Sequence, residues 1–318
     1  MTAKRVAVVD LGTNSTRLLV AEVRGGAAHE LERASNVTRL GQDVDRTGRL
    51  AEEAMERVYS VVAEYRERID LQGAETVVAV ATSAVRDAEN GEEFRAELRE
   101  RFGLDARTIS GDEEARLTFL GATAGRPAVE TEVLVIDIGG GSTEFVVGHP
   151  GQAPGFHVST RMGSVRQTER HIRDDPPPSD QVASLSDEAT AIIEADVPDE
   201  VRARVSAGIA VAGTATSLAA IDQKLDPYDP ERVHGYRLTL AAGERLLAEL
   251  AVLPLERRRQ VTGLHPDRAP TIVAGAAILL EAMRSFGLEE VEVSEADILH
   301  GAAIDAAAGG RENPLFAG

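Results

Sequence analysis

Hydrophobic residues along this chain alternate between short β-branched runs and longer segments with helical spacing. The runs at residues 7–10, 76–81 and 133–138 are almost wholly apolar, as in strands buried on both faces of a sheet. Between such runs, residues 52–69 and 181–195 place apolar side chains three and four positions apart, which predicts amphipathic helices. Strands that alternate with helices in this way predict an α/β fold.

One stretch of the pattern occurs twice. Residues 6–20 read VAVVDLGTNSTRLLV and residues 133–147 read VLVIDIGGGSTEFVV, and the two align without a gap. Each copy is a strand ending in an acid, a glycine-rich turn and a second apolar strand. The repeat predicts a duplicated domain, and the turn-forming residues 125–127 place the boundary between residues 1–126 and 127–318.

The turns have the composition of phosphate-binding loops. Glycine tolerates positive φ, so the three glycines at 139–141 predict a tight turn that presents successive N–H groups to an anion. Asp137 and Glu144 flank this turn and are candidate metal-binding carboxylates. A third small-residue turn, at 212–216, follows another predicted strand and opens a helix, where an anion is also favoured.

Acidic residues cluster after Ser110. Because Glu113 lies three positions after Ser110, the pair forms a capping-box pattern and predicts a helix that runs to about residue 121. The helix dipole favours acids in a first turn, and for Glu113 we accept this structural role. Glu114 points elsewhere around the helix and is a candidate for chemistry.

Composition narrows the possible functions. The 318 residues carry a net charge of -19, which argues against general binding to nucleic acid or anionic membranes. The cluster Arg257–Arg259 is therefore interpreted as a solvated face. The chain has no cysteine, which excludes disulfides and thiolate metal sites. Without a signal-peptide pattern or a run of ~20 apolar residues, we expect a cytoplasmic protein.

Eight motifs follow one another over nearly the whole chain. They are DLGTNSTRLLV (10–20), ATSAVRDA (81–88), ISGDEEARL (109–117), VIDIGGGSTEFVV (135–147), RMGSVR (161–166), VAGTATSLAAI (211–221), YDPERVHGYRLT (228–239) and GLHPDRAPTIVAGAAIL (263–279). Together they resemble the exopolyphosphatase / guanosine pentaphosphate phosphohydrolase (Ppx/GppA) family within the actin-like ATPase superfamily. ISGDEEARL beside IDIGGGSTE distinguishes this family from other actin-like proteins.

The resemblance implies two ribonuclease-H-like domains with a cleft between them, and Mg²⁺-assisted hydrolysis of the terminal phosphoanhydride of inorganic polyphosphate. A monovalent cation can accompany Mg²⁺, and a homodimer is compatible with the fold. Glu114 matches the catalytic glutamate and serves as general base in this hypothesis. The metal candidates are Asp10, Asp137 and Glu144. The phosphate-binding candidates are Gly12, Thr13, Asn14, Ser15, Arg17, Arg86, Gly139, Gly140, Gly141, Ser142, Gly213 and Thr214.

Three other functions are compatible with these motifs. A guanosine pentaphosphate (pppGpp) phosphohydrolase performs the same chemistry on a nucleotide, and no residue separates it from an exopolyphosphatase. A kinase of the same fold would release little phosphate until its acceptor is supplied. A nucleotide-binding switch or filament protein would bind ATP tightly and hydrolyse it slowly. The ISGDEEARL motif argues against the last two.

Overall fold

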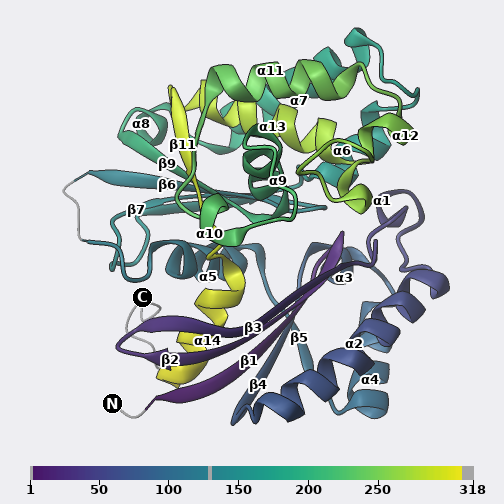
Figure 1. The fold of residues 1–318 in the computed structure, drawn as a ribbon, viewed down its shortest axis with the longest axis vertical. Helices are drawn as coiled ribbons and strands as arrows, with labels where there is room; N and C mark the ends of the chain where they lie inside the picture. Colours follow the sequence, from purple (N-terminus) through teal and green to yellow (C-terminus); the bar gives the residue numbers. More distant parts are fainter. Residues whose placement is uncertain (1–2, 128–130, 310–318) are drawn as a thin grey trace. The chain divides into compact units, whose positions relative to one another are not determined.

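The computed structural model describes residues 3–127 and 131–309. The contacts among these residues define two compact units (Figure 1). The first unit contains residues 3–127, 150–153 and 297–309, and the second contains residues 131–149 and 154–296. This grouping differs from the predicted division after residue 126 mainly in the last helix, which packs within the first unit.

The first unit is built on a five-stranded sheet in the order β3-β2-β1-β4-β5. Strands β1, β2 and β3 form an antiparallel meander, and β4 and β5 extend the sheet parallel to β1. The strands are β1 (Lys4–Leu11), β2 (Ser15–Arg24), β3 (Ala27–Val37), β4 (Thr76–Ala81) and β5 (Ala106–Thr108).

Helices cover both faces of this sheet. Successive side chains of β1 point to opposite faces, so Ala7 and Val9 pack with α2 and α4, whereas Val6 and Val8 pack with α5 and α14. The helices are α1 (Val44–Thr47), α2 (Glu52–Gln72), α3 (Ser83–Asp87), α4 (Gly91–Phe102), α5 (Gly111–Thr123) and α14 (Ile298–Ala308).

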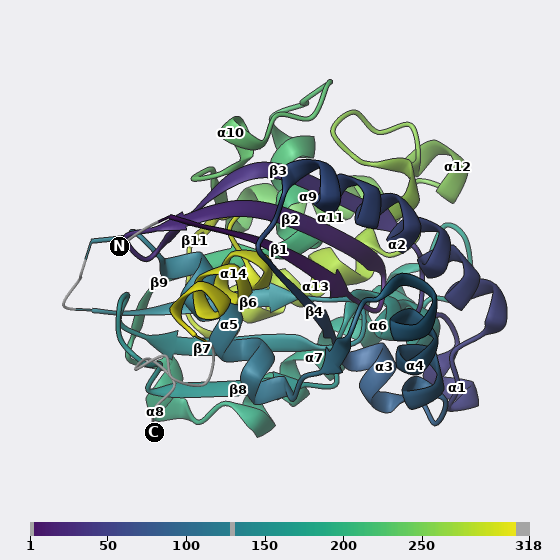
Figure 2. The ribbon, with the colours of Figure 1, turned by 90° about the horizontal axis from the view of Figure 1, so that it is seen from below.

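The backbones of α5 and α14 touch, which explains why the last helix belongs to this unit (Figure 2). A Cβ atom on Gly121 would lie 1.9 Å from the Asp297 carbonyl oxygen, and one on Gly301 would lie 1.8 Å from the Leu117 carbonyl oxygen. Only glycine permits this approach, because any side chain would occupy the space of the facing backbone.

The second unit repeats the first topology and adds one strand. Its sheet has the order β10-β11-β9-β6-β7-β8, in which β8-β7-β6-β9-β11 corresponds to β3-β2-β1-β4-β5 in order and direction. The predicted α/β fold with a duplicated domain is confirmed. The strands are β6 (Glu132–Ile138), β7 (Thr143–Gly148), β8 (Phe156–Thr160), β9 (Val205–Val211), β10 (Arg237–Thr239) and β11 (Glu290–Val293).

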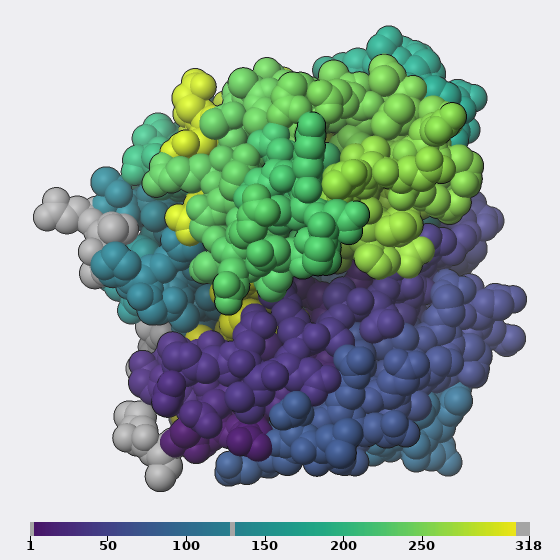
Figure 3. Space-filling view, viewed as in Figure 1, coloured from purple at the N-terminus to yellow at the C-terminus, as the bar shows by residue number. Residues whose placement is uncertain are grey.

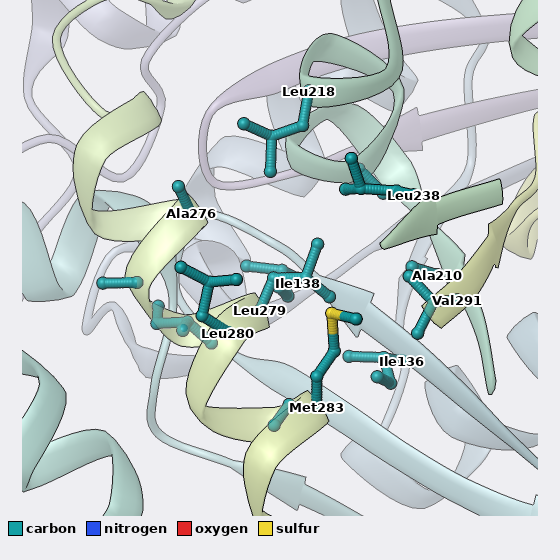
Figure 4. Packing of buried hydrophobic residues seen from close by; sticks show 14 of the residues in the cluster. Ile136, Ile138, Ala210, Leu218, Leu238, Ala276, Leu279, Leu280, Met283 and Val291 are labelled. Carbon is teal, nitrogen blue, oxygen red and sulfur yellow. The ribbon is translucent and has the colours of Figure 1, made fainter. Parts of the chain in front are cut away.

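Helix α13 forms the centre of the second core. Every residue from Ile272 to Met283 is buried, and Leu279 and Met283 pack near Ile136 of the sheet (Figure 4). On the face drawn in Figure 3, the green-coloured segments from α9 to α12 form much of the surface of this unit. Its helices are α6 (Ser164–His171), α7 (Ser179–Asp196), α8 (Asp199–Arg202), α9 (Ala212–Asp222), α10 (Pro230–Val233), α11 (Leu240–Ala251), α12 (Leu255–Arg258), η1 (Pro266–Arg268) and α13 (Ile272–Ser285).

One arginine of this unit corrects a prediction. Arg258 is 3% exposed, so the interpretation of Arg257–Arg259 as a solvated face is wrong for this residue. Its guanidinium donates to the carbonyls of Leu250 at 3.0 Å, Leu253 at 2.8 Å and Ala269 at 3.3 Å. The side chain therefore joins the end of α11 to the segment before α13.

Among residues 3–127 and 131–309, no helix is long and apolar enough to cross a membrane.

Candidate active site

The two glycine-rich turns close in the same way, as the repeat predicted. Gly12 donates its N–H to the Ser15 carbonyl, and Gly139 donates to the Ser142 carbonyl, each over 3.0 Å. A Cβ on Gly12 would lie 2.9 Å from the Ser15 oxygen, so glycine is needed here for space. The predicted reason, positive φ, is wrong: the positive-φ glycines among the described residues include none from either turn.

Helix α6 binds the carbonyl side of the second turn. Its first N–H groups donate to the carbonyls of Gly139 and Gly140 over 2.9 to 3.1 Å, and Arg166 Nε donates to the Gly141 carbonyl at 2.8 Å. Gly163 precedes the helix and permits this approach, because a Cβ there would lie 2.4 Å from the Gly140 oxygen. Sequence reasoning missed this role, although it had singled out the RMGSVR motif.

The orientation of the second turn follows from peptide geometry. In a trans peptide the N–H points opposite to the C=O of the preceding residue. Because α6 binds three successive carbonyls, the N–H groups of Gly140, Gly141 and Ser142 face away from that helix. Successive N–H groups on one side of a turn form an anion-binding concavity.

In the first turn, too, backbone N–H groups of another segment bind the carbonyls. Thr38 and Arg39 donate their N–H groups to the Asn14 carbonyl at 3.0 and 2.9 Å, and Gly41 donates to the Thr13 carbonyl at 2.8 Å. The N–H groups of Asn14 and Ser15 consequently face away from the segment that binds the carbonyls.

The second hairpin brings two predicted metal ligands together. Asp137 and Glu144 are directly opposite each other in the β6–β7 register, and they are 6% and 1% exposed. Ser159 Oγ donates to Glu144 Oε1 at 2.7 Å. In the described part of the chain, no group of three or more His, Cys, Asp or Glu side chains is placed to hold a metal ion.

The first hairpin has a different pair at the corresponding positions. Arg17 is opposite Asp10, and its Nη2 and Nε atoms lie 2.6 and 2.8 Å from Asp10 Oδ2. Burial raises the pKa of Asp10 above its usual range, and the Arg17 charge opposes this effect. Arg17 also pairs with Asp297. The structure thus places Arg17, a predicted phosphate ligand, between two carboxylates.

Glu114 lies near the start of α5, where the sequence placed it. The predicted cap is present, since Ser110 Oγ accepts the Glu113 N–H at 3.1 Å. The Glu113 carboxylate is on the surface and pairs with Arg107, in agreement with a structural role. The Glu114 side chain is only 10% exposed, and its Oε2 lies 3.2 Å from Nη1 of Arg86.

The third predicted turn opens α9. Thr214 is buried and packs closely on Gly275 of α13: a Cβ on that glycine would lie only 2.5 Å from Thr214 Oγ1. The guanidinium of Arg268 covers Gly213, where a Cβ would lie 1.5 Å from Nη1. Arg268 was not among the predicted site residues, although the GLHPDRAP motif contains it. The arrangement places a positive charge beside the helix N-terminus.

Comparisons with known proteins agree with these motifs. The profile described as the Ppx/GppA phosphatase family matches residues 19–308. Exopolyphosphatase 2 of Mycobacterium tuberculosis is 36% identical over 323 residues, which cover 96% of this chain and 100% of the relative. A crystal structure of an exopolyphosphatase-like protein has a TM-score of 0.89 at 33% identity and covers 96% of this chain and 98% of its own. For the Aquifex aeolicus Ppx/GppA family member, the TM-score is 0.81 at 32% identity, with 97% and 99% covered.

Proposed function

Because the chain belongs to the Ppx/GppA phosphatase family, as its motifs predicted, and is therefore a hydrolase, we propose that it is an exopolyphosphatase. It would hydrolyse the terminal phosphoanhydride of inorganic polyphosphate with the help of Mg²⁺. The observation that carries this proposal is the pair of turns whose carbonyls are bound from one side, so that their N–H groups face the other. A protein of net charge -19 needs such local donors to bind a polyanion.

The donor set of the second hairpin fits Mg²⁺. Mg²⁺ is commonly held by one or two carboxylates together with substrate phosphate oxygens, so a cage of three protein ligands is not required. Asp137 and Glu144 are buried and directly opposite, where two negative charges repel and favour a cation. When bound, the ion would neutralise charge on the phosphate oxygens. Asp10 is already paired with Arg17, so we assign the metal to the second hairpin.

Glu114 is the proposed general base. Its carboxylate would orient a water molecule toward the terminal phosphorus and accept a proton as the water oxygen forms the new P–O bond. The bond to the bridging oxygen breaks, and the shortened chain leaves with that oxygen. Arg86, 3.2 Å from Glu114 Oε2, holds the carboxylate in place. A positioned base typically contributes ~10²–10⁴-fold to the rate.

The test is Glu114→Gln, which keeps the size of the side chain but removes the base. We expect kcat to fall at least about a hundredfold while polyphosphate still binds. Glu113→Gln is the matched control, because the neighbouring acid is on the surface and pairs with Arg107; its kcat should match that of the wild type. A loss of less than about tenfold in Glu114→Gln would show that Glu114 is not the base.

The substrate is identified by phosphate release with Mg²⁺ from short polyphosphate, long polyphosphate, pppGpp and ATP in parallel. An exopolyphosphatase releases phosphate fastest from one of the polyphosphates. Faster release from pppGpp would replace this proposal with the nucleotide phosphohydrolase, and release from ATP alone would contradict both.

A further inference from the structure

Asp297 lies where the chain returns to the first unit and α14 begins. Its side chain is 1% exposed. As the N-cap of α14, its Oδ1 accepts the Leu299 N–H at 3.0 Å, and its own N–H donates to His300 Nδ1 at 3.3 Å. The cap accounts for one carboxylate oxygen. It leaves the second oxygen, Oδ2, to be explained.

That second oxygen binds Arg17. Nη1 of Arg17 donates to Asp297 Oδ2, while Nη2 and Nε hold Asp10 Oδ2 at 2.6 and 2.8 Å. The Asp297 side chain is 1% exposed, that of Arg17 is 15% exposed and that of Asp10 is 3% exposed. One guanidinium thus bridges two buried carboxylates, and its planar fork fixes the direction of both bonds.

The bridge determines how Asp10 is held. Asp10 Oδ1 is buried and has no hydrogen-bond partner among the described residues, so the carboxylate is oriented through Oδ2 and Arg17. Gly12, which closes the first phosphate turn, comes two residues later in the chain. A change in the direction of Arg17 therefore acts directly on the strand end that carries this turn.

We propose that Asp297 is a positioning residue for the first phosphate turn and acts through Arg17. It touches no reacting atom. By holding one edge of the guanidinium it keeps the other edge on Asp10, and so keeps the turn's N–H groups in the geometry that binds phosphate. This role rests on the proposed function, because it assumes that the turn binds the phosphates of the substrate.

The second hairpin has an acid at the position where the first hairpin has the bridging arginine. Glu144 occupies the position that corresponds to Arg17, so Asp137 faces an acid. A carboxylate placed like Asp297 would add a third negative charge there. In the first hairpin the same carboxylate faces positive charge instead, because it pairs with Arg17 and its Oδ2 also lies 3.9 Å from Nη2 of Arg33.

The test is Asp297→Asn. Asparagine keeps an oxygen for the helix cap and has almost the same volume, but it lacks the negative charge that pairs with Arg17. We expect KM for tripolyphosphate to rise about tenfold and kcat to change less than about threefold, since the turn binds substrate and the base is untouched. Asp199→Asn is the matched control. It makes the same change in an exposed aspartate, which pairs with Arg202, and it should leave both constants unchanged.

A double-variant cycle tests the route through Arg17. Arg17→Gln should raise KM as well, and adding Asp297→Asn to it should raise KM no further, because both changes remove one bridge. If the two changes raise KM independently, so that their factors multiply in the double variant, the proposal is overturned. An unchanged KM in Asp297→Asn overturns it as well. If Asp297→Asn does not fold, Arg17→Lys replaces it. Lysine keeps the positive charge but cannot bridge both acids as the planar guanidinium does, so KM should again rise. An unchanged KM in Arg17→Lys would overturn the proposal.

A failure of the proposed function can be told apart from a failure of this inference. If the wild type releases phosphate from none of the substrates, binding of tripolyphosphate is measured by calorimetry instead. Binding about tenfold weaker in Asp297→Asn than in the wild type then supports the positioning role. Equal binding, or no binding by the wild type, contradicts it.

Discussion

The contact between α5 and α14 allows one substitution to be worked through in detail. A Cβ on Gly121 would lie 1.9 Å from the Asp297 carbonyl oxygen and 2.8 Å from the backbone nitrogen of Gly301. Both neighbours are backbone atoms near the start of another helix, so neither can rotate away. Gly121→Ala therefore requires the two helices to separate by more than 1 Å to restore an ordinary contact distance.

The expected cost combines two opposing terms. Overpacking a well-packed core costs ~1–3 kcal/mol, and a backbone-to-backbone clash belongs at the upper end. Alanine in place of glycine favours a helix by about 1 kcal/mol. The net loss is about 2 kcal/mol of unfolding free energy, which lowers the melting temperature of a unit of this size by about 6 °C.

The measurement is calorimetric melting, with Gly243→Ala as the matched control. Gly243 also lies within a helix, but a Cβ there would meet the end of a side chain, Cδ2 of Leu280 at 2.7 Å, which can change rotamer. We expect this control to melt within about 2 °C of the wild type, because the helical gain offsets a small adjustment. Equal losses in both variants, or no loss in Gly121→Ala, would refute the reasoning.

Three further predictions follow from single contacts. Gly163→Ala would place a Cβ 2.4 Å from the Gly140 oxygen and displace the second turn, so phosphate release should fall at least about tenfold when measured well below the melting temperature of the variant, which the backbone clash should also lower. Tyr65→Phe removes the hydroxyl that donates to the Thr16 carbonyl at 2.9 Å and should cost ~1–2 kcal/mol in urea unfolding. Burial alone would raise the pKa of Asp297, but the Arg17 charge holds it well below its usual range. Its stabilising contribution is therefore present above about pH 4 and lost at lower pH, and in Asp297→Asn the unfolding free energy should fall less below pH 4 than in the wild type.

Features with a local signal could be predicted from the sequence. Both hairpins fit within about fifteen residues, so strand pattern, turn composition and the closing acid were all visible in one window. The cap at Ser110 was equally local and is present, and the two acids that follow it differ in exposure: the Glu113 carboxylate is on the surface, and the Glu114 carboxylate is buried beside Arg86. The gapless repeat predicted a duplicated domain, and in the structure five strands of the second sheet follow the strand order of the first.

Contacts between distant segments could not be predicted in this way. Arg17 and Asp297 are 280 positions apart, and no local pattern indicates that the last helix returns to the first unit. Arg258 lies in a run of three arginines that is typical of a surface, yet three carbonyls accept hydrogen bonds from its guanidinium and offset the cost of burying it. The role of Gly163 became visible only once α6 was placed against the second turn.

Positions 17 and 144 correspond in the repeat but carry opposite charges, so the two hairpins have the same backbone shape and different chemistry. In the first hairpin Arg17 faces Asp10, and the pair neutralises itself within the protein. In the second hairpin Glu144 faces Asp137, and two acids directly opposite each other are destabilising unless a cation lies near them. We therefore expect divalent-cation binding to weaken in Glu144→Gln and not in Arg17→Gln, although both residues follow the same motif.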